Sequence, residues 1–253
     1  MIDMLNVLDL CSQQDIVKSE VIKNHDDNLW WPNDVADPRK RLLIAGLSTR
    51  VSYRMINKYR KIIFDLNRYS YEDLQKMSGA RLSRIVRGLG LVDSRIKYLK
   101  SIFSLINSHR NDIDAMDNQE LINLIAREVD GASYKVAQCC VLYLRGYYCG
   151  IMPVDSGMKD MLLPCLGFNV AKGSLGHESA RIDLEKIVNN LDIDPLIKKN
   201  GYADIKIPKG KPLTWWAHLV LIYYKRSFCN KHNSGDCPLA KSIKGLGQCC
   251  MVG

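Results

Sequence analysis

Helical periodicity is the feature that most constrains this 253-residue chain, because it recurs along most of the sequence while strand patterns are scarce. Apolar residues lie three and four positions apart, the spacing that lines one face of a helix. Glycine, proline and aspartate interrupt this pattern at short intervals, and these residues end helices or form turns. The pattern predicts an all-α protein of short helices joined by short turns. The interruptions fall at 37–38, 78–79, 88–90, 130–131 and 167.

The composition is that of a soluble globular protein with an excess of positive charge. The apolar fraction of 47% and the charged fraction of 25% are ordinary, and the length suffices for a good core in one large or two small domains. The formal net charge of +9 favours a polyanionic partner, of which nucleic acid is the commonest. A basic enzyme without such a partner fits the charge alone equally well.

Neither end of the chain carries a pattern typical of export or membrane insertion. Residues 1–15 contain acids and no long apolar run, so we expect no secretory signal. The apolar stretch 215–224 is too short and too polar to span a bilayer. The nine cysteines, an odd number, argue against a disulfide framework. We therefore expect an intracellular protein, cytoplasmic and nucleoid-associated or nuclear, with no membrane partner.

Lys135 and Asp155 are the most informative polar residues of the chain. Lys135 follows a glycine turn and lies in the first turn of a predicted amphipathic helix. Asp155 ends a short loop before another predicted helix. A lysine and a carboxylate at two helix starts are typical of an amine nucleophile beside an acid/base, and such a turn also suits phosphate binding. Taken singly, a surface lysine and a helix N-cap are the simpler interpretations.

Four segments in the same order resemble the helix-hairpin-helix (HhH-GPD) DNA glycosylases, most closely the endonuclease III branch. Residues 129–137, VDGASYKVA, correspond to the hairpin LPGVGxKTA without its proline and second glycine. Residues 153–157, PVDSG, correspond to the second motif, with Ser-Gly in place of Thr-His or Gly-Asn after the aspartate. Residues 42–59 resemble the first barrel helix, and residues 85–102 resemble the GLxxxKAxxI segment.

The resemblance implies a two-domain fold with a six-helix barrel. The barrel would occupy residues 38–153, and residues 1–37 and 154–253 would form the second helical domain. In the family, DNA lies across the cleft between the two domains. Residues 169–213 are predicted to be an irregular surface insertion with one helix around residues 179–191.

The resemblance also implies an activity, namely base excision by a DNA glycosylase with abasic-site lyase activity. Lys135 would attack the sugar as a Schiff-base nucleophile, and Asp155 would act as the acid/base. The partner would be double-stranded DNA with a damaged or mismatched base, bound by a monomer. Three alternatives stay open: a monofunctional glycosylase in which Asp155 activates water, a non-catalytic helix-hairpin-helix DNA-binding protein, and a structural zinc or iron–sulfur protein.

Five further residues are assigned DNA contacts by the resemblance. The hairpin backbone of Gly131, Ala132 and Ser133 would donate hydrogen bonds to a phosphate, although the neighbouring Asp130 would repel it. Arg50 corresponds to the polar residue that fills the space of a flipped base, and Leu91 corresponds to the apolar wedge in the opposite strand. An arginine on a helix surface and a leucine in a loop are the simpler interpretations.

The cysteine pattern at residues 229–250 departs from the family's [4Fe–4S] motif, C-x6-C-x2-C-x5-C. Cys229 and Cys237 are assigned to its first and third positions, Ser234 occupies the second when counted back from Cys237, and the fourth is displaced to Cys249 or Cys250. A lost cluster, a cluster with altered spacing and a zinc site that includes His232 all remain open. Loss of the cluster, and hence no cofactor, is our expectation. We also predict that other cysteines lie on apolar helix faces in the core, namely Cys139, Cys140, Cys149 and Cys165.

Overall fold

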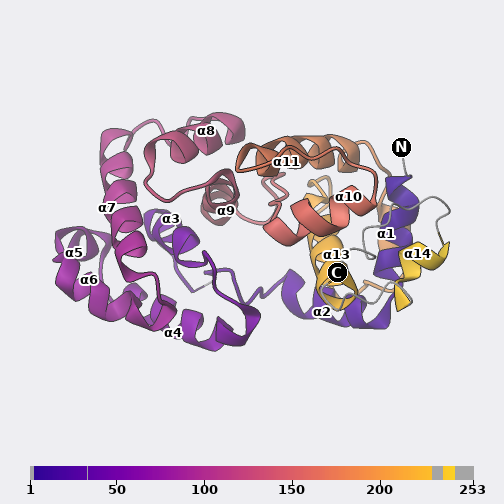
Figure 1. Ribbon diagram of the computed structural model, residues 1–253, viewed down its shortest axis with the longest axis horizontal. Coiled ribbons are helices and arrows are strands. Elements are labelled where there is room, and N and C mark those ends of the chain that lie inside the picture. The colour runs from indigo at the N-terminus through magenta and orange to yellow at the C-terminus, as the bar shows by residue number, and fades with distance from the viewer. Residues whose placement is uncertain (1–2, 33, 230–235, 243–253) are drawn as a thin grey trace. The chain divides into compact units, whose positions relative to one another are not determined.

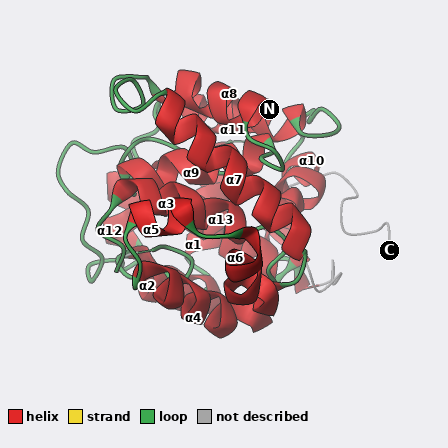
Figure 2. Ribbon diagram, turned by 90° about the vertical axis from the view of Figure 1, so that its left-hand side faces the viewer, coloured by secondary structure: helices red, strands yellow, loops and turns green. Residues whose placement is uncertain are grey.

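The computed structural model describes residues 3–32, 34–229 and 236–242, and every regular element within them is a helix (Figure 2). The prediction of an all-α protein is confirmed. None of the helices in these residues has both the length and the apolar character that a membrane span requires. The chain divides into two compact units, Leu29–Gly146 and Met1–Asn28 with Tyr147–Gly253.

The Leu29–Gly146 unit holds the helices from α3 to α9, drawn from violet to rose in Figure 1. They are α3 (Pro38–Leu47), η1 (Tyr53–Met55), α4 (Ile56–Asn67), α5 (Tyr71–Lys76), α6 (Gly79–Val86), η2 (Arg87–Leu89), α7 (Val92–Ser108), α8 (Asn118–Glu128) and α9 (Tyr134–Arg145). Helix α3 packs along α9 and α7, and α8 packs against α9.

Helix α3 forms the centre of this unit because its residues from Leu42 to Leu47 are all buried. A helix that is apolar on all sides is stable only when other helices surround it. Gly46 permits the close approach of α7, since a Cβ at this position would lie 2.2 Å from the Tyr98 ring. The Tyr98 hydroxyl donates to Leu42 O at 2.6 Å, which joins the same two helices.

Residues 42–59, which resemble one helix of the family, are two helices here. Helix α3 ends at Leu47 and α4 begins at Ile56, with the short 3-10 helix η1 between them. The Ser48 hydroxyl donates back to Ala45 O at 2.7 Å, and Arg50 has a left-handed backbone with φ of 53°. A left-handed residue cannot continue a right-handed helix, so the chain turns at this point.

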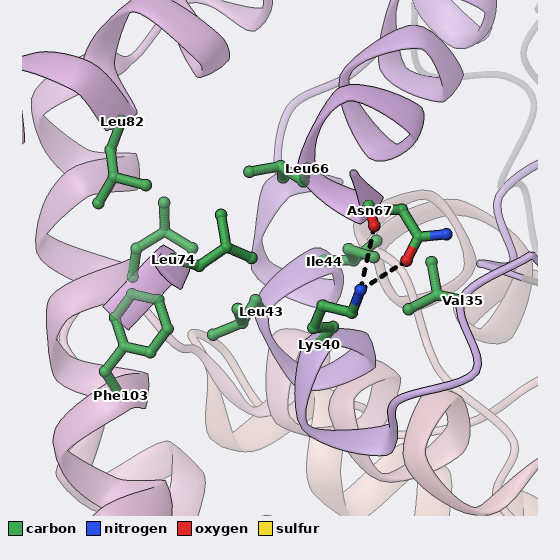
Figure 3. A pocket seen from close by; sticks show the side chains of 10 residues that line it. Val35, Lys40, Leu43, Ile44, Leu66, Asn67, Leu74, Leu82 and Phe103 are labelled. Atoms are coloured by element: carbon green, nitrogen blue, oxygen red, sulfur yellow. Dashed lines mark hydrogen bonds between the residues drawn. The ribbon is translucent and has the colours of Figure 1, made fainter. Parts of the chain in front are cut away.

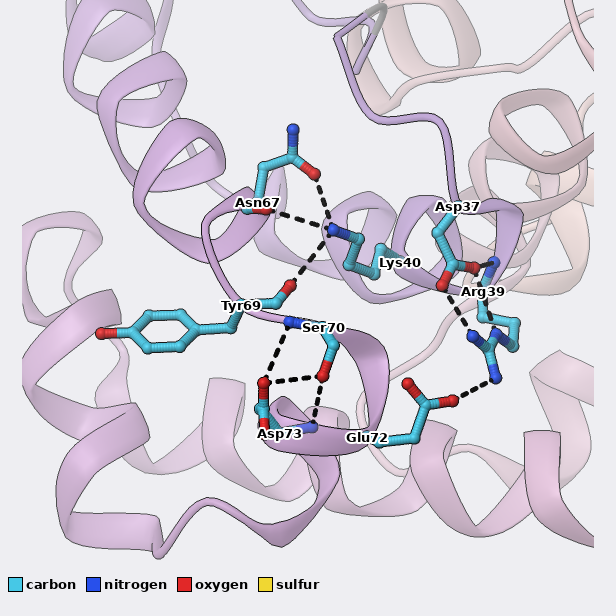
Figure 4. A network of polar contacts seen from close by, with 8 residues as sticks. All are labelled: Asp37, Arg39, Lys40, Asn67, Tyr69, Ser70, Glu72 and Asp73. Atoms are coloured by element: carbon cyan, nitrogen blue, oxygen red, sulfur yellow. Dashed lines mark hydrogen bonds and ion pairs between the residues drawn. The ribbon is translucent and has the colours of Figure 1, made fainter.

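Polar contacts fix the junctions between α3, α4 and α5. Lys40 Nζ donates to Asn67 Oδ1 at 2.7 Å and to the carbonyls of Asn67 and Tyr69, each at 3.2 Å (Figure 4). Ser70 and Asp73 form a reciprocal capping box that starts α5. The Lys40 ammonium of α3 thus contacts both the end of α4 and the loop that leads into α5.

An apolar hollow lies beside this network, and Lys40 and Asn67 line its rim (Figure 3). Its walls include Leu43 of α3, Leu74 of α5 and Phe103 of α7. The free space inside is about that of one water molecule, too little for a nucleobase. The hollow is therefore a packing gap in the core and does not supply a substrate pocket.

The second unit is built around a helix that is buried on nearly all sides. Its helices are α1 (Met4–Ser12), α2 (Asp15–His25), η3 (Met158–Leu162), α10 (Leu163–Cys165), α11 (Leu175–Val188), α12 (Asp194–Lys199), α13 (Thr214–Ser227) and α14 (Pro238–Ser242). Helix α13 has buried residues from Thr214 to Lys225 and packs against α1 and α2. The Trp215 indole donates to His25 O at 3.0 Å and so joins α13 to the end of α2.

The prediction of a surface insertion at residues 169–213 is wrong for much of this segment. Helix α11 begins at Leu175, and a second helix, α12, follows it. Tyr202 is 1% exposed, and its hydroxyl donates to Ser12 O at 2.8 Å. Lys199 pairs with Asp9 at 2.8 Å. The polar residues that made the segment resemble a loop are thus partners of α1. Gly167, by contrast, follows α10 with φ of 79° and ends it as predicted.

Candidate functional site

The hairpin that the sequence assigns to phosphate binding connects α8 and α9. Gly131 has φ of 78°, a left-handed backbone that favours glycine. Ala132 is buried and its amide donates to Val129 O at 3.0 Å, so this amide is used within the turn. Gly131 and Ser133 are exposed. Of the three predicted contact residues, these two are therefore accessible to solvent.

Contacts from α7 hold the hairpin in place. The Asp130 amide donates to Ser101 Oγ at 3.0 Å, and Ser101 Oγ donates to Glu128 O at 3.1 Å. One hydroxyl thus joins the end of α8 to the turn, as both acceptor and donor. The hairpin keeps its shape without the proline that the family has in place of Asp130.

Lys135 is the second residue of α9 and is half-buried. The N-cap residue, Ser133, makes no side-chain hydrogen bond to the helix. Because the first amides of a helix have no intrahelical acceptor, the start of α9 is a favourable place for an anion. Lys135 therefore lies one helical turn or less from a backbone that suits a phosphate.

Asp155 precedes the helix η3 in the second unit, and its two carboxylate oxygens have different partners. Oδ1 accepts the Met158 amide at 2.7 Å, which makes Asp155 the cap of this helix start. Oδ2 lies 3.5 Å from Lys225 Nζ of α13. The Asp155 side chain keeps 31% of its surface exposed, whereas that of Lys225 keeps 8%. The carboxylate is anchored on one side and open to solvent on the other.

Gly157 makes room for Lys225. A Cβ at this position would lie 2.2 Å from Lys225 Nζ and 2.8 Å from its Cε. Any larger residue at position 157 therefore displaces the ammonium from Asp155. The departure from the family motif at Ser156-Gly157 has a physical reason in this chain, namely the lysine that lies against it.

Two side chains of α11 hold the segment before Asp155. The Met152 amide donates to Glu185 Oε1 at 2.8 Å, and Val154 O lies 2.7 Å from His177 Nδ1. Glu185 also pairs with Arg181, which makes two further bonds to Glu178 at 2.7 and 3.0 Å. Burial raises the pKa of Glu185, and Arg181 opposes this shift. The loop thus rests on a buried ionic network.

The sequence interpretation missed Lys225, His177 and Glu185. All three lie far along the chain from Asp155, in α11 and α13. Lys225 had a weak local signal in the sequence, because it directly follows the apolar run at 215–224. The structure shows that Lys225 is buried together with that run. A lysine on a buried helix face needs a negative partner. That signal indicates that an acid is near, but it does not say which one.

We expect the free energy of unfolding to fall as the pH drops below about 6.5, the ordinary pKa of histidine. Burial lowers the pKa of both His25 and His177 below that value. In this window the unfolded chain binds protons that the folded protein resists, so stability falls with pH until the folded pKa values are passed. Above about pH 6.5 both states are neutral at these sites, and the two histidines contribute no pH dependence.

Denaturant unfolding of the wild type and of His177→Gln at a series of pH values measures this effect. Glutamine retains a donor for Val154 O but does not titrate. A smaller pH dependence is expected for His177→Gln between about pH 6.5 and 5. An identical pH dependence in both proteins would contradict the assignment to His177.

Arg50 and Leu91 share an unusual backbone. Among the described residues they are the two that have a left-handed φ without being glycine, 53° for Arg50 and 48° for Leu91. Both are exposed, Leu91 to 45%. Arg50 lies in the loop after α3, and Leu91 lies between η2 and α7. Each is thus held outward in a conformation that costs free energy.

Of the candidate metal ligands, Cys229 and Cys237 lie within the described residues. The others, His232, Cys249 and Cys250, lie outside them. Cys229 and Cys237 are buried, and the Tyr224 hydroxyl lies 3.1 Å from Cys237 Sγ. Burial raises the pKa of Cys11, and the nearby thiols Cys229 and Cys237 raise it further. In the described part of the chain, no three metal-binding side chains gather at one point.

The other cysteines follow the core prediction with one exception. Cys139, Cys140 and Cys165 are buried, but Cys149 is only partly buried. Cys149 lies beyond the end of α9, two residues after Tyr147. The Tyr147 ring stacks on Trp215 with ring centroids 4.6 Å apart. The apolar helix face assumed for Cys149 is therefore absent, because α9 ends at Arg145.

Comparisons with known proteins find similarity at the level of structure. Neither the family models nor the curated proteins searched contain a match to this sequence. Among solved structures, the chain is similar to H. pylori 3-methyladenine DNA glycosylase (MagIII) bound to 1,N6-ethenoadenine. That match has a TM-score of 0.54 and 14% identity, and it covers 89% of this chain and 98% of that one.

A second similar structure is that of MBOgg1 in complex with a low-affinity DNA ligand. It has a TM-score of 0.51 and 17% identity, and the match covers 90% of this chain and 72% of that one. Both matches extend over nearly all of the present chain. The chain therefore has the fold of the helix-hairpin-helix DNA glycosylases, which confirms the resemblance seen in its motifs at the level of the fold.

Proposed function

We propose that this protein is a DNA glycosylase of base-excision repair that removes a damaged or mismatched base from duplex DNA and then cleaves the abasic site as a lyase. The fold supports the glycosylase part, because both matches cover about nine tenths of this chain and one of the two structures is named as a DNA glycosylase. The net charge of +9 suits a DNA partner. The lyase part rests on Lys135 and its place in the hairpin motif.

The observation that carries the proposal best is the setting of Asp155. Its carboxylate is fixed by the Met158 amide and by Lys225, yet 31% of the side chain stays exposed. A fixed, ionised and accessible carboxylate can stabilise the positive charge that develops on the sugar as the glycosidic bond breaks. A mere helix cap requires neither the buried ammonium nor the ionic network behind the loop.

Lys135 supplies the nucleophile in the proposed mechanism. The free amine attacks the sugar C1′, and the bond between C1′ and the base breaks with its electron pair leaving on the base. The two amine protons are transferred, one to the departing base and one to the ring oxygen, and opening of the sugar ring at the C1′–O4′ bond then leaves a Schiff base between the lysine nitrogen and C1′. Removal of a proton from C2′ then allows the 3′ phosphate to leave by β-elimination, which cuts the strand. Asp155 is assigned the proton transfers.

The hairpin is assigned the phosphate contact in this proposal. Gly131 and Ser133 are exposed, and the first amides of α9 have no side-chain cap. Backbone amides at a helix start bind phosphate without regard to the sequence of the DNA. Asp130 is exposed in the same turn and opposes this binding. A protein that acts at many different sites needs such contacts for positioning only.

The test is base release from duplexes that each contain one modified base, followed by borohydride reduction with abasic DNA. The set includes alkylated, etheno, oxidised and deaminated bases and mismatches. Release of at least one base together with a covalent adduct supports the whole proposal. Release without an adduct supports the monofunctional alternative with Asp155-activated water. Duplex binding with neither result would leave a non-catalytic DNA-binding protein.

We propose further that the protein works without an iron–sulfur cluster. Counted back from Cys237, Ser234 stands at the family's second cysteine position, and a serine hydroxyl is a poor ligand for iron. The Cys237 thiol is in contact with the Tyr224 hydroxyl, and α13 anchors this end of the chain by burial. We expect protein purified without oxygen to be colourless, as measured by its absorption spectrum and iron content. A brown protein with stoichiometric iron would contradict this, and zinc alone would indicate that His232 joins the cysteines.

A further inference from the structure

Arg95 is a buried cation of the Leu29–Gly146 unit that the proposed reaction does not use. It lies in the first turns of α7 and is 3% exposed. Buried guanidinium groups are costly unless their donors are satisfied. The partners of this group therefore indicate what it holds.

The guanidinium donates four hydrogen bonds, and all four acceptors are backbone carbonyls. NH1 donates to Leu47 O at 2.7 Å, and NH2 donates to Thr49 O at 3.0 Å. Nε donates to Gly90 O at 2.8 Å, and NH2 also reaches Leu89 O at 3.3 Å. No carboxylate takes part in these four bonds, so the donors of the guanidinium are matched by carbonyl dipoles.

These carbonyls belong to two helix ends and the loops that follow them, which are far apart in the sequence. Leu47 ends α3 and Thr49 stands directly before Arg50, whereas Leu89 ends η2 and Gly90 stands directly before Leu91. Arg50 and Leu91 are the two non-glycine residues with a left-handed backbone among those described. One side chain thus fixes the segments that lead into both of the strained, exposed residues.

The planar fork of arginine suits this arrangement better than any other side chain. Its five donors point in fixed directions, so it can hold two loops at a set separation. A lysine has a single nitrogen and cannot reach both loops with the same geometry. Strained backbone persists only where the surrounding structure enforces it, and Arg95 supplies that enforcement for both loops together.

We propose that Arg95 is a positioning residue that holds Arg50 and Leu91 as one unit for insertion into duplex DNA. This inference rests on the proposed function, in which Arg50 fills the space of the flipped base and Leu91 enters the opposite strand. Pre-organised loops lose less conformational entropy on binding than free ones. Release of either loop would therefore weaken the contribution of both residues.

The first arm of the test is amide hydrogen exchange on the free protein, which does not depend on any activity. Arg95→Lys is compared with the wild type, and Arg110→Lys, at an exposed position, serves as the control for an arginine-to-lysine change elsewhere. In Arg95→Lys we expect protection to fall by at least about tenfold at 47–51 and 88–92 together, with the hairpin at 129–133 unchanged. Faster exchange in one loop only, or in neither, would overturn the proposal.

The second arm is a double-mutant cycle on single-turnover base release. In the wild-type background, Arg50→Ala and Leu91→Ala are each expected to slow release about tenfold. In the Arg95→Lys background, each is expected to slow it by less than about twofold, since the loops are already displaced. Equal losses in the two backgrounds would overturn the proposal, whatever the size of the loss.

The two arms separate this inference from the proposed function. If the wild type releases no base but Arg95→Lys loosens both loops, the glycosylase assignment fails and the role of Arg95 in the fold stands without its DNA role. If the wild type is active and the cycle is additive, the glycosylase assignment stands and Arg95 is not a positioning residue. Arg95→Met provides a second background in which all four carbonyls lose their donor.

Discussion

Lys135→Ala is expected to abolish strand cleavage at an abasic site, with a loss on the order of a thousandfold or more, as for removal of an enzyme nucleophile. Alanine cannot form the Schiff base, so no covalent adduct should appear after borohydride reduction. Val136 and Ala137 next to it are buried and α9 is otherwise unchanged, so the fold should persist. Gel assays of cleavage and trapping, with binding to a stable abasic analogue, measure the effect.

Lys135→Arg is the matched control for charge. Arginine keeps the positive charge near the phosphate contact but stays protonated and cannot attack the sugar. If Lys135 is the nucleophile, Lys135→Arg should lose cleavage as fully as Lys135→Ala while it binds DNA better. Cleavage by either variant at the wild-type rate would remove Lys135 from the lyase mechanism. Base release that persists in both variants would favour the monofunctional alternative.

Asp155→Asn is expected to slow base release by at least about a hundredfold, the range for loss of one electrostatic group at a reacting centre. It is also expected to lower the free energy of unfolding by about 1–3 kcal/mol, because a buried cation loses its partner. Asparagine has one oxygen where aspartate has two. It can accept the Met158 amide or face Lys225 Nζ, but it cannot do both.

Lys225→Met separates the two effects of Asp155→Asn. Methionine removes the buried ammonium and keeps much of the side-chain volume. We expect the double variant, Asp155→Asn with Lys225→Met, to be more stable than Asp155→Asn alone, as measured by denaturant unfolding. The double variant should still release no base. Base release restored by Lys225→Met would show that Asp155 serves the fold and not the chemistry. If Asp155→Asn alone releases bases at the wild-type rate, Asp155 is only a cap.

Local sequence signals predicted the parts of this fold that depend on local physics. The glycine turn at Gly131 and the position of α9 after it follow from the backbone freedom of glycine and from apolar spacing. The stop at Gly167 follows from its backbone freedom. Placement of Lys135 near the start of α9 and of Asp155 before η3 needs no more than these rules.

The remaining features could not be predicted because they depend on contacts between distant residues. Asp155 and Lys225 are 70 positions apart, and Arg95 reaches Leu47 across 48 positions. In the sequence, Arg95 is one of many charged residues on an amphipathic helix, and nothing local marks it as buried. Tyr202 and Lys199 lie in a polar segment, and their partners lie in α1, about 190 positions earlier in the sequence. Apolar periodicity carries no information on such pairs.

The contact between Gly157 and Lys225 has a consequence for how this chain can evolve. The family places histidine or asparagine where this chain has glycine, yet a Cβ there would lie 2.2, 2.8 and 2.9 Å from Nζ, Cε and Cδ of Lys225. A larger residue at 157 thus requires that the Lys225 side chain move away from Asp155 or that position 225 change. Loss of Lys225 first leaves Asp155 without its counter-ion. Either substitution alone disturbs the contact between Asp155 and Lys225, whereas the two substitutions together avoid the clash. Positions 157 and 225 are therefore expected to covary among sequences related to this one.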